Sequence, residues 1–282
     1  MQEAVQLLTP SWYLHSETSQ FTPLIALSNI INKPPLWLWC YYVQSSCYYT
    51  RRIILSIFTI GDLHLSLGVS KPMDIFEGWQ DYHIRLQNNW QRVVKPEDTV
   101  IVCGDISWAL DIKDAVEDFK FIENLNGNKI ILKGNHDYWW QTAKKLNNFL
   151  EENQFKTIKF LFNNSYEVED IIVCGTRGWI FENGEPADEK IILREQGRLK
   201  MSLDYMQSDK EKVVFLHYPA IYQNLQNTHI LDTLNEYNIK RCYYGHLHGK
   251  SIKYAFQDEF NGCKHKLISA DALEFCPFII NK

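Results

Sequence analysis

Short apolar runs alternate with amphipathic stretches along the chain from about residue 55 onward. The apolar runs have the length of β-strands, and most end in glycine or in a polar cluster: "IILSIFTIGDLH", "TVIVCGDIS", "KIILKGNHD", "IIVCGTRGW", "KVVFLHYP" and "RCYYGHLH". Such continuous runs are typical of strands that are buried on both faces. The stretches between them have helical spacing, at about 74–94, 111–126, 138–152, 186–207 and 219–238. This alternation predicts an α/β fold with a largely parallel central sheet.

The end of the chain has a different pattern, because "KSIKYAF" and "CKHKLISADAL" are separated only by "QDEFNG". Two strand-like runs joined by a short polar segment are typical of a β-hairpin. We therefore expect some antiparallel pairing and a mixed sheet. No repeat, low-complexity tract or linker divides residues 55–282, which we interpret as one domain.

Residues 1–54 have neither the period of a helix nor that of a strand. We interpret them as an extension that is either disordered or encoded upstream of the native start. Arg51-Arg52 could be encoded by AGG AGG, a ribosome-binding sequence, and Leu55 by TTG, an alternative bacterial start codon. The native protein would then begin with Leu55 read as methionine. The gene sequence of these codons tests this hypothesis.

Composition and charge argue against several classes of partner. The chain has 282 residues, of which 45 % are hydrophobic and 22 % charged, as in globular domains. A net charge of -5 offers no basic surface for extended nucleic acid or for an anionic membrane. The most apolar stretch, around 24–43, is interrupted by Lys33-Pro34-Pro35, so we expect no membrane span. The N-terminus lacks a signal-peptide pattern and the cysteines lack CxxC spacing, which favours a reduced, cytoplasmic protein.

Polar side chains collect where the apolar runs end, most densely in "KIILKGNHDYWW" at residues 129–140. Polar groups at the end of a buried strand are costly unless a site uses them. In open α/β sheets, ligands bind at the carboxyl ends of the strands, and five of the runs carry such residues there. These residues are Asp62, His64, Asp105, Asn135, His136, Asp137, His217, His246 and His248.

This set of side chains is suited to metal ions. Carboxylate, amide and imidazole groups without thiolates offer oxygen and nitrogen ligands, which suit Mn, Fe or Zn. The set is too large for one ion. Two cations about 3.5–4 Å apart need a bridging carboxylate, with neutral oxygen and imidazole completing each shell. The pattern therefore predicts a cofactor of two divalent metal ions.

Five blocks occur in a defined order: "GDLH", "GD", "GNHD", a histidine at a strand end and "GHLH". In this order and spacing the chain resembles the calcineurin-like metallophosphoesterase superfamily, and within it a branch of predicted bacterial phosphohydrolases, over nearly all of residues 56–249. Each block alone is a weak signal, whereas the set is specific. The resemblance implies an αββα sandwich with mixed central sheets and an active site at the carboxyl ends of the strands.

The resemblance also implies a role for each polar residue. The two metal shells would be Asp62 with His64 and His248, and Asn135 with His217 and His246. Asp105 would bridge the two ions. His136 would not bind metal but would approach the phosphate and the leaving group, with Asp137 orienting it.

The activity implied in this way is hydrolysis of a phosphomonoester or phosphodiester by in-line attack of metal-bound hydroxide. Two cations neutralise the anionic ester and lower the pKa of a bridging water, and an imidazole such as His136 belongs on the leaving-group side. The alternative is a non-catalytic, metal-binding scaffold of the same fold that mediates protein interactions. Because every ligand and His136 are present, the enzyme is favoured.

Two further residues are candidates for contact with the substrate. The second block reads "GDISW", with Trp108 where the family commonly has an acidic or amide residue, so the wall of the site must differ there. Arg177 in "CGTRGW" follows another strand and could bind a phosphate through two hydrogen bonds. It could equally pair with Glu182 or Glu185.

Other aromatic and histidine residues are expected to be structural. Trp139 and Trp140 follow "GNHD" and could stack on a substrate ring, yet aromatics at helical spacing more often pack in a core. His83, His229 and His265 match no motif, and we interpret them as surface residues or as core residues with satisfied hydrogen bonds.

Overall fold

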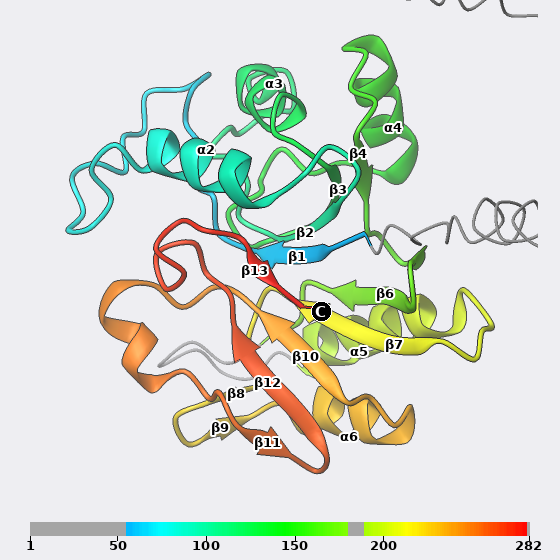
Figure 1. Ribbon diagram of the computed structural model, residues 1–282. Helices are drawn as coiled ribbons and strands as arrows, with labels where there is room; N and C mark the ends of the chain where they lie inside the picture. Colours follow the sequence, from blue (N-terminus) through cyan, green and yellow to red (C-terminus); the bar gives the residue numbers. More distant parts are fainter. Residues whose placement is uncertain (1–54, 180–188, 281–282) are drawn as a thin grey trace, which may run out of the picture. The chain divides into compact units, whose positions relative to one another are not determined.

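Two β-sheets lie face to face in the part of the chain that the computed structural model describes, residues 55–179 and 189–280 (Figure 1). The first sheet consists, in order, of β13 (Phe278–Ile279), β1 (Ile57–Ile60), β2 (Thr99–Cys103), β3 (Asn128–Leu132) and β4 (Ile158–Phe160). The second consists, in order, of β11 (Glu259–Phe260), β12 (Cys263–Leu267), β10 (Arg241–Tyr244), β7 (Glu211–Leu216), β6 (Ile171–Thr176) and β5 (Tyr166–Val168). The extension interpreted at residues 1–54 lies outside the described residues.

Parallel pairing dominates both sheets. β1, β2, β3 and β4 pair in parallel, as do β6, β7, β10 and β12. β13, β5 and β11 add antiparallel strands at the edges, which confirms the predicted mixed sheets. A separate hairpin of β8 (Ile221–Tyr222) and β9 (Leu225–Gln226) follows β7.

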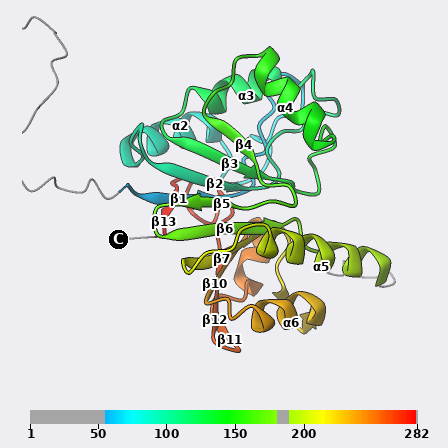
Figure 2. The ribbon, with the colours of Figure 1, turned by 90° about the vertical axis from the view of Figure 1, so that its right-hand side faces the viewer.

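Helices cover the outer face of each sheet (Figure 2). The first sheet is covered by α2 (Tyr82–Val93), α3 (Val116–Glu123) and α4 (Ala143–Glu152), and the second by α5 (Glu189–Asp204) and α6 (Thr228–Glu236). α2 buries Tyr82, Leu86 and Trp90, which recur every four residues and so share one face. The order helix, sheet, sheet, helix is the αββα sandwich expected from the sequence. Of the helix expected at 186–207, residues 186–188 lie outside the described part.

Side chains from both sheets meet in a core between them. Ile57, Ile101 and Ile130 come from the first sheet, Val213 and Phe215 come from the second, and all are at most 3 % exposed. One face of each central strand therefore meets the helices and the other meets the opposite sheet. This double burial is the reason for the continuous apolar runs in the sequence.

Four helices begin later than their amphipathic pattern does, among them α3, which begins at Val116 rather than near residue 111. α2 begins at Tyr82 rather than near residue 74, because Gly78 and Asp81 have left-handed backbones with φ of 83° and 50°. α4 begins at Ala143 rather than near residue 138, and α6 begins at Thr228, after the β8–β9 hairpin. The residues before α2 instead form a loop, which lies beside the site described below.

The hairpin predicted near the C-terminal end is only partly correct. β11 and β12 do pair antiparallel, with Phe260 opposite Cys263. The segment "KSIKYAF" is not the first strand, because Gly249–Tyr254 form a 3-10 helix, η1. The His248 amide donates to Ser251 Oγ at 3.1 Å, which satisfies an amide at the start of this helix.

The described cysteines, Cys103, Cys174, Cys242, Cys263 and Cys276, are free thiols. Burial raises the pKa of Cys174 and of Cys263 to about 12, so these thiols stay protonated and unreactive at neutral pH. Within the described ranges, no helix combines the length and the apolar character needed to cross a membrane.

His265 on β12 is buried, at 4 % exposure, and neither of its ring nitrogens has a hydrogen-bond partner among the described residues. It is therefore neither the surface histidine nor the satisfied core histidine that the sequence suggests. Burial lowers the pKa of its imidazole from 6.5 to about 4. Between these pH values the folded state binds fewer protons than the unfolded state, so the fold loses stability as the pH falls from 6.5 to about 4.

We compare the metal-free wild type with metal-free His265→Phe as the pH is lowered from neutral to 4. The unfolding free energy of the wild type should fall by about 3 kcal/mol more than that of the variant, because the variant carries no group at this position to protonate. Urea denaturation at a series of pH values measures the difference. His229→Phe, which changes a partly exposed histidine, is the control and should follow the wild type. Parallel profiles for His265→Phe and the wild type would contradict this account.

Candidate metal centre

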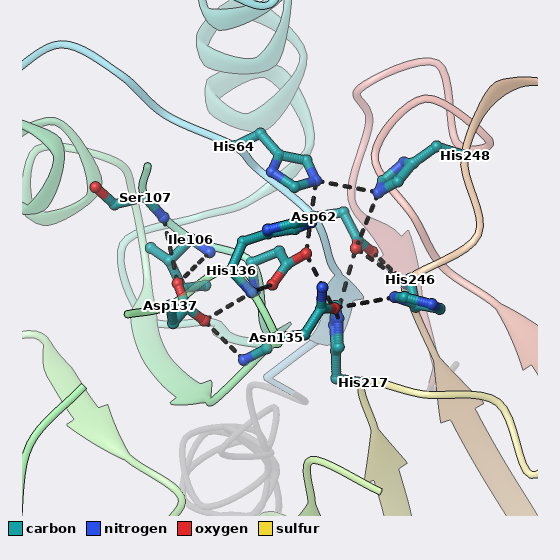
Figure 3. A network of polar contacts seen from close by, with 12 residues as sticks. Asp62, His64, Ile106, Ser107, Asn135, His136, Asp137, His217, His246 and His248 are labelled. Carbon is teal, nitrogen blue, oxygen red and sulfur yellow. Dashed lines mark hydrogen bonds and ion pairs between the residues drawn. The ribbon is translucent and has the colours of Figure 1, made fainter. Parts of the chain in front are cut away.

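Five strands bring the predicted polar residues to one edge of the two sheets (Figure 3). The residues follow the strands in this order: Asp62 and His64 after β1, Asp105 after β2, Asn135 and His136 after β3, His217 after β7, and His246 and His248 after β10. Backbone hydrogen bonds join the turns, since the Asp62 amide donates to the Gly104 carbonyl (2.9 Å) and the Gly245 amide to the His217 carbonyl (3.1 Å). The side chains from separate turns therefore converge on one place.

Several of the predicted ligands have backbone conformations that non-glycine residues rarely adopt. Asp62, His64, Asp105 and His246 have φ of 59°, 45°, 51° and 71°. Each such residue costs about 1–3 kcal/mol and persists only where the surrounding structure enforces it. The strained residues lie at the strand ends, where their left-handed backbone conformation turns consecutive side chains toward the centre.

Two glycines let the carboxylates approach the backbone closely. A Cβ on Gly134 would overlap Asp105 Oδ1, and a Cβ on Gly245 would overlap Asp62 Oδ2. The space is used, because the His246 amide donates to the two oxygens of Asp62 at 2.9 and 3.0 Å. Only glycine allows this packing.

Asp62, His64 and His248 form a first group, whose ligand atoms lie within 4.8 Å of one another. His248 Nε2 lies 3.1 Å from His64 Nε2 and 3.2 Å from Asp62 Oδ1. On the other side of the ring, His248 Nδ1 lies 3.2 Å from Asp271 Oδ1. A carboxylate accepts, so Nδ1 carries a proton, and the lone pair of a neutral His248 is on Nε2, facing the group.

Asp62, Asp105 and His217 form a second group within the same 4.8 Å limit. His217 Nδ1 donates to the Cys103 carbonyl at 3.0 Å, which leaves the lone pair on Nε2. That Nε2 lies 2.6 Å from Asn135 Oδ1 and 3.5 Å from Asp105 Oδ2. The lone pair of His217 therefore faces two oxygens.

Asp105 and Asn135 lie between neighbouring histidines. Asp105 Oδ2 is 3.7 Å from His64 Nε2 in the first group and 3.5 Å from His217 Nε2 in the second. Asn135 Oδ1 is shared by His217 and by His246, whose Nδ1 lies 3.0 Å away. Carboxylate and amide oxygens repel an imidazole lone pair that faces them unless a cation lies between the two. The donors are oxygen and imidazole nitrogen, so these residues fit divalent cations.

Burial and mutual charge set the protonation of the two carboxylates. Burial, and then the charge of Asp62, raises the pKa of Asp105 to about 8. Burial opposes ionisation of Asp62 too, but His248 and His217 hold its pKa well below the usual range. Burial alone would lower the pKa of His248, yet Asp62 and Asp271 raise it to about 10. Without a cation, a proton on His248 compensates Asp62, and a divalent ion would take over that role.

The other histidines of the centre are neutral at neutral pH. Burial lowers the pKa of His246 to about 3 and that of His136 to about 4, and it also lowers the pKa of His64 and of His217. Neutral imidazole is the form that binds a metal ion. The predicted ligands His64, His217 and His246 are thus in the binding form.

Asp137 is buried and holds the turns that carry the ligands. The donors to its carboxylate are the amides of Asp105 (2.9 Å), Ile106 (2.8 Å), Ser107 (3.4 Å) and Gly134 (2.7 Å), and Trp139 Nε1 (3.1 Å). The His136 imidazole is not among these donors, and its Nδ1 is buried without a described partner. The orienting contact that the resemblance implies is therefore replaced by a different one: Asp137 fixes the ends of β2 and β3.

We expect Asp137→Asn to lower the unfolding free energy by about 2–4 kcal/mol. The asparagine side chain has one acceptor oxygen instead of two, so backbone N–H groups of the two turns are left without an acceptor. The turns should loosen, and metal affinity should fall with them. Urea denaturation and calorimetric titration with Mn²⁺ measure the two effects. Asp98→Asn, at a buried carboxylate that accepts from the Ser56 amide (2.8 Å), is the control and should lose stability but keep its metal affinity. Unchanged affinity in Asp137→Asn would refute this role.

Trp108 and His136 lie beside the first group. The Trp108 ring stacks on His64 with 4.9 Å between centroids and lies 4.5 Å from the His136 ring. Lys71 Nζ lies 3.4 Å from the centroid of Trp108. Trp108 Nε1 and His136 Nδ1 are both buried and have no hydrogen-bond partner in the described part of the chain. The structure thus brings Trp108, a predicted substrate contact, to the centre.

Arg177 approaches the centre mainly through its backbone. Its carbonyl accepts from the amides of His217 (3.1 Å) and Tyr218 (2.8 Å). Its guanidinium pairs with the buried Glu195 on α5 at 3.4 Å. The partners that the sequence suggested, Glu182 and Glu185, lie outside the described residues. Contact with a phosphate stays a hypothesis for Arg177.

The structural interpretation of the two consecutive tryptophans is confirmed. Trp139 and Trp140 are 0 % and 9 % exposed, and both rings pack against Phe160. His83 and His229 are partly exposed and take no part in the centre.

Asp271 is the site residue that sequence reasoning missed. Besides its contact with His248, its Oδ2 accepts from the Gly249 amide at 2.8 Å. It follows β12, which pairs in parallel with β10, the strand that leads to His248. The signal was the acid in "LISADAL", a polar residue just after another apolar run.

Two comparisons of the sequence with known proteins gave different results. Residues 55–250 match the family model of calcineurin-like phosphoesterases. A search of curated proteins finds no match. The matched range includes every residue of the two groups.

Several solved structures are similar to this chain. A protein of unknown function from Aquifex aeolicus is 18 % identical, over 80 % of this chain and 95 % of that chain, with a TM-score of 0.45. TT1561 of Thermus thermophilus is 13 % identical, over 69 % of this chain and 82 % of that chain, with a TM-score of 0.48. The phosphopantetheinyl hydrolase of Mycobacterium tuberculosis is 14 % identical, over 76 % of this chain and 88 % of that chain, with a TM-score of 0.47.

Proposed function

The chain belongs to the calcineurin-like phosphoesterase family, and from this premise we propose that it hydrolyses a phosphate monoester or diester at a centre of two divalent cations. The family and the candidate ligand groups support a metal-dependent phosphohydrolase in general terms. The observation that carries the finer proposal is the pair of ligand groups, which share Asp62 and are both approached by Asp105 Oδ2, 3.7 Å from His64 Nε2 and 3.5 Å from His217 Nε2.

The two proposed cations are Mn, Fe or Zn, and each of the two has its own set of donors. One would be held by Asp62, His64 and His248, and the other by Asn135, His217 and His246, with Asp105 bridging them. When bound, the cations would neutralise the ester oxygens and lower the pKa of the attacking water. Their preference for oxygen and imidazole matches the donors of both sets.

The remaining steps fall to side chains of the chain itself. His136 lies at the edge of the first group, 5.7 Å from the His64 ring, and its Nδ1 has no described partner. A neutral imidazole still donates one hydrogen bond, and we assign that bond to the phosphate or to the leaving oxygen. Asp137 and Asp271 act as positioning residues, because they hold the turns and His248. Trp108 would exclude water from one side of the ester.

The test is turnover of p-nitrophenyl phosphate and bis(p-nitrophenyl) phosphate by the full-length protein, loaded separately with Mn, Fe, Zn or Mg. We expect hydrolysis of at least one ester, loss of turnover with a chelator and recovery on adding metal back. The preferred ester separates a phosphomonoesterase from a phosphodiesterase. Two bound ions per chain without turnover of either ester would favour the non-catalytic scaffold instead.

A further inference from the structure

A cavity of about 550 Å³ opens beside the metal centre. Three of its lining residues, His64, His136 and His248, belong to the centre itself. A ligand whose phosphate lies at the metal ions can therefore extend into this space without crossing a barrier. Pockets of this volume are typical of sites for small organic ligands.

The far wall of the cavity is apolar and mostly aromatic. It is formed by Met73, Phe76, Trp79 and Trp108. Met73 and Trp79 are buried, whereas Phe76 is 51 % exposed at the rim. The Trp79 ring lies 5.8 Å from the His64 ring and 5.7 Å from the His248 ring, so the aromatic surface begins at the metal ligands.

The loop before α2 supplies most of this wall and is held in place by its own contacts. Trp79 packs on Tyr82 with 5.3 Å between centroids, and the Tyr82 hydroxyl donates to the His64 carbonyl at 2.8 Å. Left-handed backbones at Gly78 and Asp81 keep the loop out of the helix. The wall is thus tied to the centre rather than free to collapse.

Few charged groups lie along the described part of the lining. Besides the site histidines, they are Glu77 and Lys250, and Lys71 Nζ lies 3.4 Å from the centroid of the Trp108 ring. The large apolar surfaces between them disfavour a charged or strongly polar occupant, which would lose its hydration without compensation.

We propose that this cavity binds the leaving group of the substrate, and that the leaving group is a large, uncharged, apolar group. The inference rests on the proposed function for the position of the phosphate. Each methylene that such a group buries strengthens binding about threefold to fourfold, until the cavity is full.

A series of n-alkylphosphonates with two, four, six and eight carbons tests the proposal, because they share one headgroup, do not hydrolyse and differ only in apolar length. Calorimetric titration of the Mn²⁺-loaded, full-length protein gives their dissociation constants. We expect the octyl compound to bind at least about 30-fold more tightly than the ethyl compound. Phe76→Ser should flatten this dependence. Ile75→Ser, a neighbouring side chain that is 76 % exposed and outside the lining, should leave it unchanged.

A dissociation constant that does not change with chain length overturns the inference, as does an equal response of Phe76→Ser and Ile75→Ser. Turnover of the matching n-alkyl phosphates separates this result from the proposed function. Hydrolysis of ethyl phosphate with no effect of chain length would support the proposed function and contradict the role proposed for the cavity. Binding that tightens with chain length, without hydrolysis of any ester in the series, would support the role of the cavity and contradict the proposed function.

Discussion

Asp105→Asn is expected to remove bound metal and to lower turnover about 100-fold to 1,000-fold in the same protein. Asp105 Oδ2 lies 3.7 Å from His64 Nε2 and 3.5 Å from His217 Nε2, so this carboxylate, like that of Asp62, reaches both ligand groups. Asparagine has the same shape but lacks the charge and one of the two oxygens. Metal content per chain and turnover of the preferred ester measure the two losses.

The stability of the metal-free protein distinguishes this effect from misfolding. Burial and the charge of Asp62 raise the pKa of Asp105 from 3.8 to about 8. Between these values the folded state holds a proton that the unfolded state has released, so the wild type loses stability as the pH rises through this range. Metal-free Asp105→Asn has no such group, and at neutral pH it should be at least as stable as the wild type.

Asp98→Asn is the matched control, because Asp98 is a buried carboxylate just before β2, the strand that ends next to Asp105. Its oxygens accept from the Ser56 and Lys95 amides, both at 2.8 Å. The substitution should cost stability and leave metal binding intact. A metal content of two ions in Asp105→Asn, or loss of metal in Asp98→Asn, would contradict the bridging role.

The fold class and the candidate ligand set follow from one property of the sequence. Strands buried on both faces are continuous apolar runs, so any polar side chain at their ends is conspicuous. Asp62, Asp105 and His217 were found in this way, since each comes directly after such a run. The same property could not locate Asp271, because the tail was interpreted as a hairpin and its second strand was not paired with β10.

Helical spacing does not predict a helix correctly where apolar residues face a cavity instead of a core. Met73, Phe76 and Trp79 recur every three residues, as on one face of a helix that continues into α2. Spacing does not report φ, and the left-handed backbones of Gly78 and Asp81 interrupt the helix. The residues share a face because they line one cavity.

Sequence adjacency was also a poor guide to contact. His136 and Asp137 are consecutive, and the resemblance pairs them, but the Asp137 carboxylate points to backbone amides of two turns. A buried carboxylate binds the donors that are nearest in space, and here these are main-chain groups from the end of β2. Such a contact is long-range and leaves no local signal in the sequence.

His136→Ala is expected to keep both metal ions and to lower kcat about 100-fold to 10,000-fold. His136 lines the cavity beside the centre and lies outside both ligand groups, so its loss should remove a hydrogen bond to the ester and no donor to a cation. Metal content and steady-state kinetics of the full-length protein measure the two quantities. His229→Ala, at a partly exposed histidine, should match the wild type in both.

The dependence of turnover on the leaving group distinguishes the two oxygens that could accept the hydrogen bond from His136. If its hydrogen bond goes to the leaving oxygen, His136→Ala should lose far more turnover with an alkyl phosphate than with p-nitrophenyl phosphate, whose leaving oxygen needs little stabilisation. If the bond goes to a phosphate oxygen, both esters should lose equally. His136→Asn keeps a donor and should recover part of the turnover in either case. Full activity of His136→Ala with both esters would remove His136 from the mechanism and leave the chemistry to the metal centre alone.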